Sequence, residues 1–348
     1  MDNTRNQFWS GMAVVVLFGA GLVSCQKATV PGPADSSSGN PNTKTTTNLV
    51  QGPPVITWWS TGDSIPYTAY LPSDPPVSMW YSVGFAINGK GFVLGGMLNT
   101  QSGQADHVPA LWMFDPAAQA WDSMARYPGN YGGLVGEAVF VIGDNAYVVQ
   151  DNAVWQYNQP TNHWTAKGNF PGAARFWGTG MAINGKGYFG LGVNDHTIED
   201  MVNWWQYDPT TDHWTRMADF GGAARDQAAG FAIGGKGYVC LGEATTGSDY
   251  STVWQYDPVA NSWDQKKSLT GLSGGGSVAV NATIGGVELG LLVGGGHLWA
   301  YNPAINSWYD EGTSANVGSG GALPPAAFVI GNSFCIAHIA MASYNWTR

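Results

Sequence analysis

The chain has 348 residues, of which only 11% are charged, and its formal net charge at pH 7 is −10. This sparse, acidic balance supplies no positive surface for a phosphate backbone, so we expect no nucleic-acid partner. The length permits one large all-β domain of about 300 residues once the N-terminal segments are set aside.

The chain begins with the features of a secretory signal. Arg5 lies in a short polar region, residues 8–22 are mostly apolar, and Leu22-Val-Ser-Cys25 follows, which resembles the lipobox of bacterial lipoproteins. The apolar run is short for a membrane span and ends at small residues. We therefore expect residues 1–24 to be a lipoprotein signal peptide and Cys25 to carry the lipid. The alternative is an ordinary secretory signal in which Cys25 has no role.

Residues 25–52 are predicted to be a disordered tether. Residues 26–52 are rich in Ser, Thr, Pro, Asn and Gly and contain almost no large apolar side chains, so they cannot bury enough surface to offset the entropy of chain ordering. With a lipid at Cys25, the tether would hold residues 53–348 near the outer membrane. The sequence does not decide between the periplasmic and the cell-surface side.

The folded region repeats one type of hairpin. Two short apolar runs flank an Asn-Gly or Gly-Gly pair, which supplies the positive φ angles of a type I′ turn. The clearest copies are Gly84–Gly96, Met181–Gly192 and Phe231–Gly242, and degenerate copies occur at residues 141–147, 283–288 and 329–334. The sequence therefore predicts six such hairpins.

A second hairpin follows each of the first five. Its segment reads Trp-x-Tyr-Asp-Pro or a close variant and ends in another tryptophan, with first tryptophans 43, 50, 49 and 45 residues apart: Trp112, Trp155, Trp205, Trp254 and Trp299. Asp caps the turn, Pro presets φ, and the aromatic residues pack between neighbouring sheets. Two hairpins make four strands, named a to d here, which is one blade of a β-propeller.

The count of blades closes through the N-terminus. Trp346 continues the tryptophan series after the sixth hairpin, but the chain ends before a d strand, whereas the segment from Val55 to Pro66 has the pattern of a d strand. We expect this N-terminal segment to be the outer strand of the last blade, beside a c strand near Trp346, so that no sheet edge stays open. The prediction is a six-bladed propeller.

The Gly-rich b strands and the Tyr-Asp-Pro…Trp segments resemble the Kelch repeat family. The form with Gly-Lys-Gly-Tyr and Trp-x-Tyr-Asp-Pro is similar to Kelch-containing lipoproteins of the Bacteroidetes type, and the resemblance covers residues 53–348. It implies the propeller fold. It implies little about activity, because Kelch propellers include enzymes, glycan binders and protein scaffolds.

One face of the ring is expected to carry function. Antiparallel alternation places the d-to-a and b-to-c connections on one face and the stereotyped turns on the other. The b-to-c loops vary strongly in length: residues 97–110 are long, 193–203 and 243–252 are intermediate, and those near 151 and 296 are almost absent. Variable loops on a rigid frame are where binding groups usually lie, so we expect the site there.

The predicted ligand-binding residues come from these connections. Two arginines at equivalent positions, neighbouring carboxylates and an aromatic ring would hold a sugar or a carboxylate by bidentate hydrogen bonds and stacking. The predicted set is Arg175, Trp177, Arg225, Asp226, Glu243, Asp195 and His196. The alternative is that the arginines bind backbone carbonyls and that the loop acids and His196 are solvated surface.

Two further features limit the chemistry. Cys240 and Cys335 lie in apolar strand-like runs and are predicted to be buried thiols rather than a disulfide or a metal pair. No metal-ligand spacing is present, so we expect no cofactor. Calcium stays open at Asp195, Glu199 and Asp200, whose spacing matches no EF-hand.

The favoured function is recognition of a glycan or a protein by a lipid-anchored monomer, not catalysis. Galactose oxidase is a Kelch propeller, but its tyrosine, histidine and cysteine copper site has no counterpart here, which argues against copper chemistry. The alternative is an enzyme resembling N-acetylneuraminate epimerase, which would need an acid and a base flanking a pocket.

Overall fold

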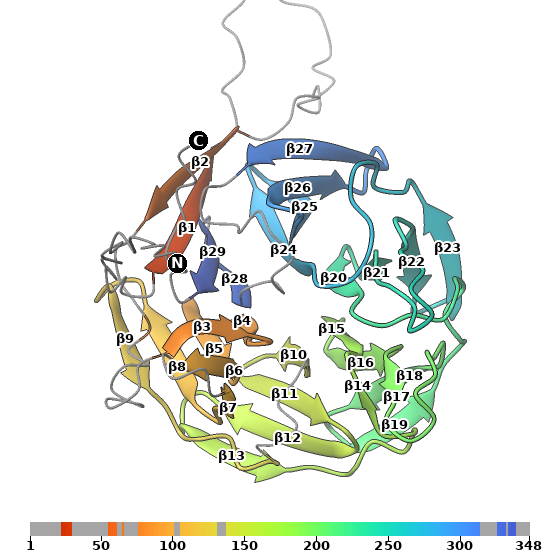
Figure 1. The fold of residues 1–348 in the computed structure, drawn as a ribbon, viewed down its shortest axis with the longest axis horizontal. Helices are drawn as coiled ribbons and strands as arrows, with labels where there is room; N and C mark the ends of the chain where they lie inside the picture. The colour runs from red at the N-terminus through yellow and green to blue at the C-terminus, as the bar shows by residue number, and fades with distance from the viewer. Residues whose placement is uncertain are drawn as a thin grey trace, which may run out of the picture.

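A computed structural model describes residues 22–29, 55–60, 65, 76–100, 105–130, 137–313, 326–331 and 333–338. Within these ranges the regular secondary structure consists of β-strands. The same ranges contain no helix that is long and apolar enough to cross a membrane. The sheets are arranged around a central axis with their inner strands side by side (Figure 1). The predicted all-β propeller is confirmed.

Five blades, numbered I to V, each take four antiparallel strands from one stretch of chain, in order from the axis outward. Blade I consists of β4 (Val83–Ile87), β5 (Lys90–Leu94), β8 (Leu111–Asp115) and β9 (Ala120–Ser123). Blade II consists of β10 (Ala138–Ile142), β11 (Asn145–Gln150), β12 (Ala153–Asn158) and β13 (His163–Ala166). Blade III consists of β15 (Thr179–Ile183), β16 (Lys186–Gly190), β18 (Trp204–Asp208) and β19 (His213–Arg216). Blade IV consists of β20 (Ala229–Ile233), β21 (Lys236–Cys240), β22 (Val253–Asp257) and β23 (Ser262–Lys266). Blade V consists of β24 (Val278–Ile284), β25 (Val287–Gly294), β26 (His297–Asn302) and β27 (Ser307–Thr313).

A sixth four-stranded sheet joins the two ends of the chain. From the axis outward it contains β28 (Ala326–Ile330), β29 (Ser333–His338), β1 (Leu22–Thr29) and β2 (Val55–Ser60). The N-terminal segment supplies the outer strand, as predicted. The third strand is β1 and not a segment near Trp346, which lies outside the described residues; β1 completes the backbone ladder with both β29 and β2.

The position of β1 bears on the predicted signal and tether. The strand begins three residues before the predicted cleavage site, so cleavage there would shorten it to Cys25–Thr29, residues that the sequence assigns to the tether. In the ladder, the Cα of Cys25 is paired with that of Cys335. Cys335 is buried and disulfide-bonded, so the prediction of a thiol is wrong for Cys335, because a strand from the N-terminus lies beside it. Cys240 is a free, buried thiol as predicted.

Two smaller sheets lie among the connections. One consists of β3 (Pro76–Trp80), β6 (Met97–Thr100) and β7 (Ala105–His107), and the other of β14 (Arg175–Phe176) and β17 (Val193–Asn194). The long b-to-c loop of blade I is therefore itself a hairpin, paired to the strand that precedes the blade.

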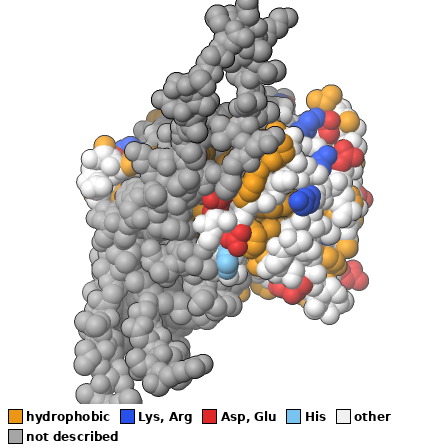
Figure 2. Space-filling view, turned by 90° about the horizontal axis from the view of Figure 1, so that it is seen from above, with side chains coloured by type: hydrophobic (Ala, Val, Ile, Leu, Met, Phe, Trp, Pro, Cys, Tyr) orange, Lys and Arg blue, Asp and Glu red, His pale blue; other side chains and the backbone are white. Residues whose placement is uncertain are grey.

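The stereotyped turns are scaffold. Asn184 and Gly185 have φ angles of 50° and 75°, the pattern of a type I′ turn. In the same blade, the Nζ of Lys186 in this hairpin lies 2.6 Å from the Oδ2 of Asp208 in the Tyr-Asp-Pro turn. Blades I and IV repeat this ion pair, which joins the two hairpins of a blade. Seen from the rim, the described surface carries acidic and basic side chains among polar and apolar ones (Figure 2).

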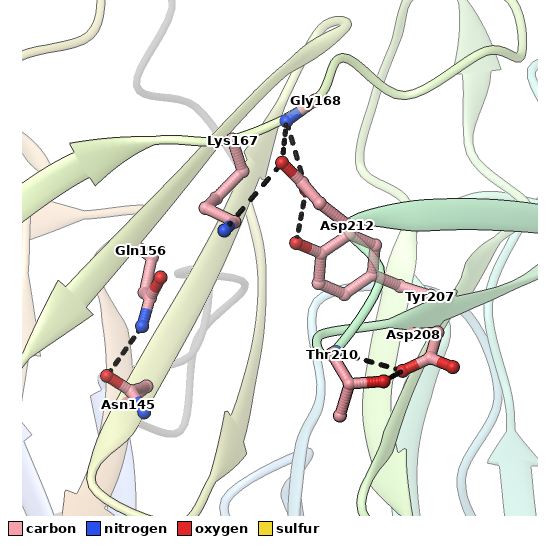
Figure 3. A network of polar contacts seen from close by, with 8 residues as sticks. All are labelled: Asn145, Gln156, Lys167, Gly168, Tyr207, Asp208, Thr210 and Asp212. Atoms are coloured by element: carbon pink, nitrogen blue, oxygen red, sulfur yellow. Dashed lines mark hydrogen bonds and ion pairs between the residues drawn. The ribbon is translucent and has the colours of Figure 1, made fainter.

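A repeated polar contact joins each of blades II to V to its predecessor. Tyr207 donates its hydroxyl proton to Oδ1 of Asp212 at 2.6 Å, and the same carboxylate accepts the backbone N–H of Gly168 from the preceding blade (Figure 3). Asn162, Asn261 and Asn306 repeat the arrangement with their own tyrosines and preceding blades. The tyrosines of the repeat are therefore occupied in the scaffold and are not available for ligand chemistry.

Candidate functional site

A pocket of about 220 Å³ lies on the ring axis. Its walls are the residues that precede and open the inner strands β4, β10, β15, β20 and β24, one from each of blades I to V. The d-to-a connections enter the inner strands at this end. The pocket therefore opens on the face that the sequence predicted to carry function.

Three bulky side chains reach the pocket from strained backbone. Tyr81, Trp177 and Gln227 each lie two residues before an inner strand, and their φ angles are 59°, 57° and 50°. The equivalent residue of blade V is Gly276, for which a positive φ carries no such cost. A left-handed conformation costs an L-residue roughly 1 to 2 kcal/mol, and such strain concentrates at functional sites. The left-handed backbone thus places the three side chains in the lining of the axial pocket.

An aromatic pair lies over the pocket. The rings of Tyr81 and Trp177 stack with centroids 6.4 Å apart and an interplanar angle of 18°, and Phe176 supports Trp177 edge-on at 4.8 Å. The indole Nε1 of Trp177 is buried and has no hydrogen-bond partner. The pKa of the Tyr81 phenol is raised by burial and by the nearby charge of Glu243. The pair offers flat apolar ring faces, which suit a sugar ring.

Two glutamates lie in or behind the pocket wall. Glu137 lines the wall just before β10 and is buried, with 9% of its surface exposed. Glu243 stands behind Gln227: the Gln227 Nε2 donates to the Glu243 Oε1 at 2.5 Å. The amide of Gln227 is thereby fixed, with its carbonyl oxygen left to accept a hydrogen bond.

Asp226 lies behind the pocket wall. Its backbone pairs with that of Glu243 through N–H···O bonds of 2.9 and 3.1 Å, and its side chain is almost fully buried. Burial, followed by the neighbouring carboxyl of Asp200, raises the pKa of Asp226 to about 7. Asp200 is held in turn by the backbone N–H and hydroxyl of Thr245. Asp200 therefore joins the b-to-c loop of blade III to the d-to-a connection and to the b-to-c loop of blade IV.

Asp226 should make stability depend on pH. Its carboxyl holds a proton more tightly in the folded chain than at the ordinary value of 3.8, so the folded state binds more protons between about pH 4 and 7. The free energy of unfolding should therefore fall as pH rises through this window. In urea unfolding at pH 5 and pH 8, the free energy of unfolding of Asp226→Asn should fall less between the two pH values than that of the unchanged protein. Burial also raises the pKa of Glu311 to about 7, but Glu311 is present in both proteins and contributes equally to each. Equal pH dependence of the two proteins would therefore contradict the raised pKa of Asp226.

Arg175 and Arg225 do not reach the pocket. The guanidinium of Arg175 donates to the carbonyl oxygens of Ala173 and Leu191 and to Oδ1 of Asn203, and lies over the ring of Phe170. Both arginines are at least 98% buried. The geometry thus favours the structural alternative over ligand contact, because each guanidinium already ties its d-to-a connection to the loop beyond.

The remaining predicted residues divide. Trp177 lines the pocket, and Asp226 and Glu243 lie just behind its wall. Asp195 and His196 are exposed in a turn closed by Asn194, whose Oδ1 accepts the N–H of His196, and they do not line the pocket. In the part of the chain that the structure describes, no three His, Cys, Asp or Glu side chains are placed to hold a metal ion.

Tyr81, Glu137, Gln227 and Ser277 line the pocket and were not predicted from the sequence. Their shared signal is position: each lies one or two residues before an inner strand. Alignment of the repeats on the start of the a strand, instead of on the tryptophans, would have collected them.

No protein-family model matches the chain, and neither does any curated protein. Among solved structures it is similar to one titled "Structure of YjhT", with a TM-score of 0.61 and 17% sequence identity. The match covers 78% of this chain and 97% of the other. At this identity the likeness shows the fold alone, a β-propeller.

Proposed function

We propose that this Kelch-type propeller is a recognition protein that binds a saccharide in the axial pocket. The observation that carries the proposal is the Tyr81 and Trp177 ring pair, held over the pocket by left-handed backbone and flanked by Glu137 and the amide of Gln227. Sugar rings stack on such faces while their hydroxyls bond the flanking polar groups. A pocket of about 220 Å³ has room for one sugar ring and is far smaller than the surface that a protein partner would cover.

The test is saccharide binding by the full chain and by Trp177→Gly, first on a glycan array and then by calorimetry. Glycine suits the φ of 57°, so the variant loses the ring without retaining the backbone strain. Loss of stacking, worth about 1.5 kcal/mol, should weaken binding at least about tenfold.

His213→Ala is the matched control, because His213 is exposed at the start of β19 on the opposite face. It should leave affinity unchanged. Unaltered binding by Trp177→Gly would place the ligand elsewhere, and the absence of binding to any saccharide would overturn the proposal.

The anchor belongs to the same proposal. Signal cleavage before Cys25 and lipidation at that residue would hold the ring at the outer membrane, on its periplasmic or outer side, as the sequence of residues 1–25 supports. The lipid would take the sulfur of Cys25, and because the chain has three cysteines and Cys240 is free, a lipidated chain would lack the disulfide of Cys335. The mass of the first mature residue tests it, since an unmodified Cys25 would refute lipid attachment.

A sugar epimerase is the second candidate. The feature that favours it is the buried carboxyl of Asp226 next to Glu243: burial raises the pKa of Asp226 to about 7, and a general acid or base works best with a pKa near the working pH. An aldose-epimerisation assay by NMR distinguishes the candidates. Turnover that is lost in Asp226→Asn would favour the enzyme, and binding without turnover would favour recognition.

A further inference from the structure

Two carboxyls from different blades meet behind the pocket wall. Asp226, in the d-to-a connection of blade IV, has 2% of its surface exposed, and its carboxyl meets that of Asp200 from the b-to-c loop of blade III. In the part of the chain that the structure describes, the Oδ1 atom of each is buried and accepts no hydrogen bond from another side chain. Two such acceptors form a hydrogen bond when one of the carboxyls carries a proton. The pair is therefore satisfied by one shared proton.

The groups that face Asp226 come from each segment packed against it. Asp200 approaches from blade III and Glu243 from the b-to-c loop of blade IV. The connections into blades III and V also pack here, and their residues 176–178 and 271–277 contain no titratable side chain. The other acids of the two loops are exposed to solvent: Asp195, Glu199 and Asp249. The side chains that approach the Asp226 carboxyl from other segments are thus acidic or neutral.

Arg225 does not take the place of the shared proton. It precedes Asp226 in the chain and is positively charged, but its Nη1 donates to the carbonyl oxygen of Leu241 at 2.7 Å and to the hydroxyl of Thr252. Its guanidinium lies 4.2 Å from the ring centroid of Tyr250. Loss of the proton therefore leaves two carboxylates side by side, and in a buried site such charges repel strongly.

Gln227 connects this carboxyl pair to the pocket. It follows Asp226 in the chain and lines the pocket. Its amide donates to the Oε1 of Glu243 at 2.5 Å and also bonds the carboxyl of Asp226. Its backbone N–H donates to the carbonyl oxygen of Trp177 at 3.1 Å. The arrangement of the carboxyl pair thus bears directly on two residues of the pocket lining.

The same pair holds two loops together. The Oδ2 of Asp200 accepts the backbone N–H and the hydroxyl of Thr245 in the b-to-c loop of blade IV. Asp226 and Glu243 exchange two backbone hydrogen bonds beside it. Surface loops open at a lower free-energy cost than core strands do. Repulsion between the carboxylates is therefore relieved by movement of the loop that carries Asp200.

We propose that the Asp226 and Asp200 pair is a pH switch of the axial pocket: with its shared proton it holds Gln227 and the loop of blade III in the binding arrangement, and without the proton it releases both. The inference rests on the proposed saccharide-binding function and adds its regulation. Burial and the carboxyl of Asp200 raise the pKa of Asp226 to about 7, so the proton is lost as the pH rises through this value. Saccharide affinity should therefore fall above pH 7, and by linkage binding should take up a proton there.

The test is calorimetric titration of the full chain at pH 6 and pH 8.5 with D-glucose, D-galactose, D-mannose and N-acetyl-D-glucosamine. These sugars do not titrate in this range, so a change in affinity comes from the protein. The affinity of the tightest of them should fall at least about fivefold, the lower end of the range for coupled sites. Titration at pH 7.5 in two buffers of different ionisation enthalpy should show proton uptake on binding.

Asp200→Asn should bind at pH 6 as the unchanged chain does and lose the pH dependence. The amide oxygen can still accept from Thr245, and the amide nitrogen can donate to Asp226 at either pH. Glu311→Gln is the matched control, because burial also raises the pKa of Glu311 to about 7, but Glu311 lies on β27 outside the pocket lining. This variant should keep the pH dependence. A pH dependence that survives Asp200→Asn, or that Glu311→Gln abolishes, would overturn the inference.

Hydrogen exchange without saccharide separates the failure of the switch from that of the proposed function. Above pH 7 the backbone N–H of Thr245 should lose protection in the unchanged chain, after correction for the intrinsic effect of pH, but not in Asp200→Asn. If a saccharide binds with an affinity that is independent of pH, the switch fails and saccharide binding stands. If no saccharide binds but Thr245 loses protection, the proposed function fails and the pH-dependent opening stands. If neither occurs, both fail.

Discussion

Arg225→Ala should lower the free energy of unfolding by about 3 kcal/mol. The substitution leaves the buried carbonyl of Leu241 and the carbonyl of Ala223 without their donor, and each unsatisfied buried acceptor costs about 1 to 3 kcal/mol. It also removes the guanidinium that stacks 4.2 Å from the ring centroid of Tyr250. Urea unfolding followed by tryptophan fluorescence measures the loss.

Two variants define the cause. Arg225→Lys should recover little stability, because an ammonium cannot reproduce the planar fork that reaches several acceptors. Arg216→Ala, which removes an exposed arginine paired with Asp219, should cost less than about 1 kcal/mol. A folded Arg225→Ala variant of native stability that has lost saccharide binding would instead restore Arg225 to the ligand site.

The two arginines occupy equivalent positions in neighbouring blades, and this equivalence indicates a structural role. Arg175 and Arg225 follow Phe170 and Phe220 by the same spacing, and in the structure each guanidinium lies over that phenylalanine. A residue repeated in phase with its packing partner serves the blade. Trp177 belongs to no such series, and of the predicted residues it is the one that lines the pocket.

The fold was predictable because each repeat contains recognisable turn residues and the aromatic residues that pack between the blades. The pocket was less predictable, because Tyr81, Glu137 and Gln227 occupy positions just before the inner strands where the copies share no residue type. Tyr81 and Gln227 share a left-handed backbone angle, and nothing in a tyrosine or a glutamine signals that angle.

The closing sheet marks a second limit of prediction. The outer strand β2 was predicted from its Trp-Trp pattern, whereas β1 was assigned to the signal and the tether from its composition. Strand pairing depends on which segment completes the backbone ladder of β29, and composition does not report that.

The second glycine of the Gly-Lys-Gly motif has a role that turn chemistry does not explain. Gly187 lies inside β16, and a Cβ there would overlap the ring of Phe140 in blade II. Gly91 receives Phe328 and Gly290 receives Phe231 in the same way. An aromatic ring of one blade thus fills the space above a glycine of the next, which fixes the spacing between blades.

Gly187→Ala should therefore destabilise the chain by about 3 kcal/mol, at the upper end of the cost of overpacking. The ring of Phe140 cannot move aside, because it is 2% exposed and packs against Tyr147, Tyr207 and Trp214. Thermal unfolding should show the loss as a fall in Tm, although alanine is otherwise the better strand and backbone residue.

A double-mutant cycle separates the steric effect from any general effect on the strand. Phe140→Leu alone should destabilise by leaving a void above Gly187, and in combination with Gly187→Ala the two costs should sum to more than the measured loss, because the methyl group partly fills the void. Blade II supplies the control: it carries Ala146 in β11, and Ala146→Gly should cost only about 1 kcal/mol. Strict additivity of the cycle would show that the ring above Gly187 does not determine the spacing between the blades.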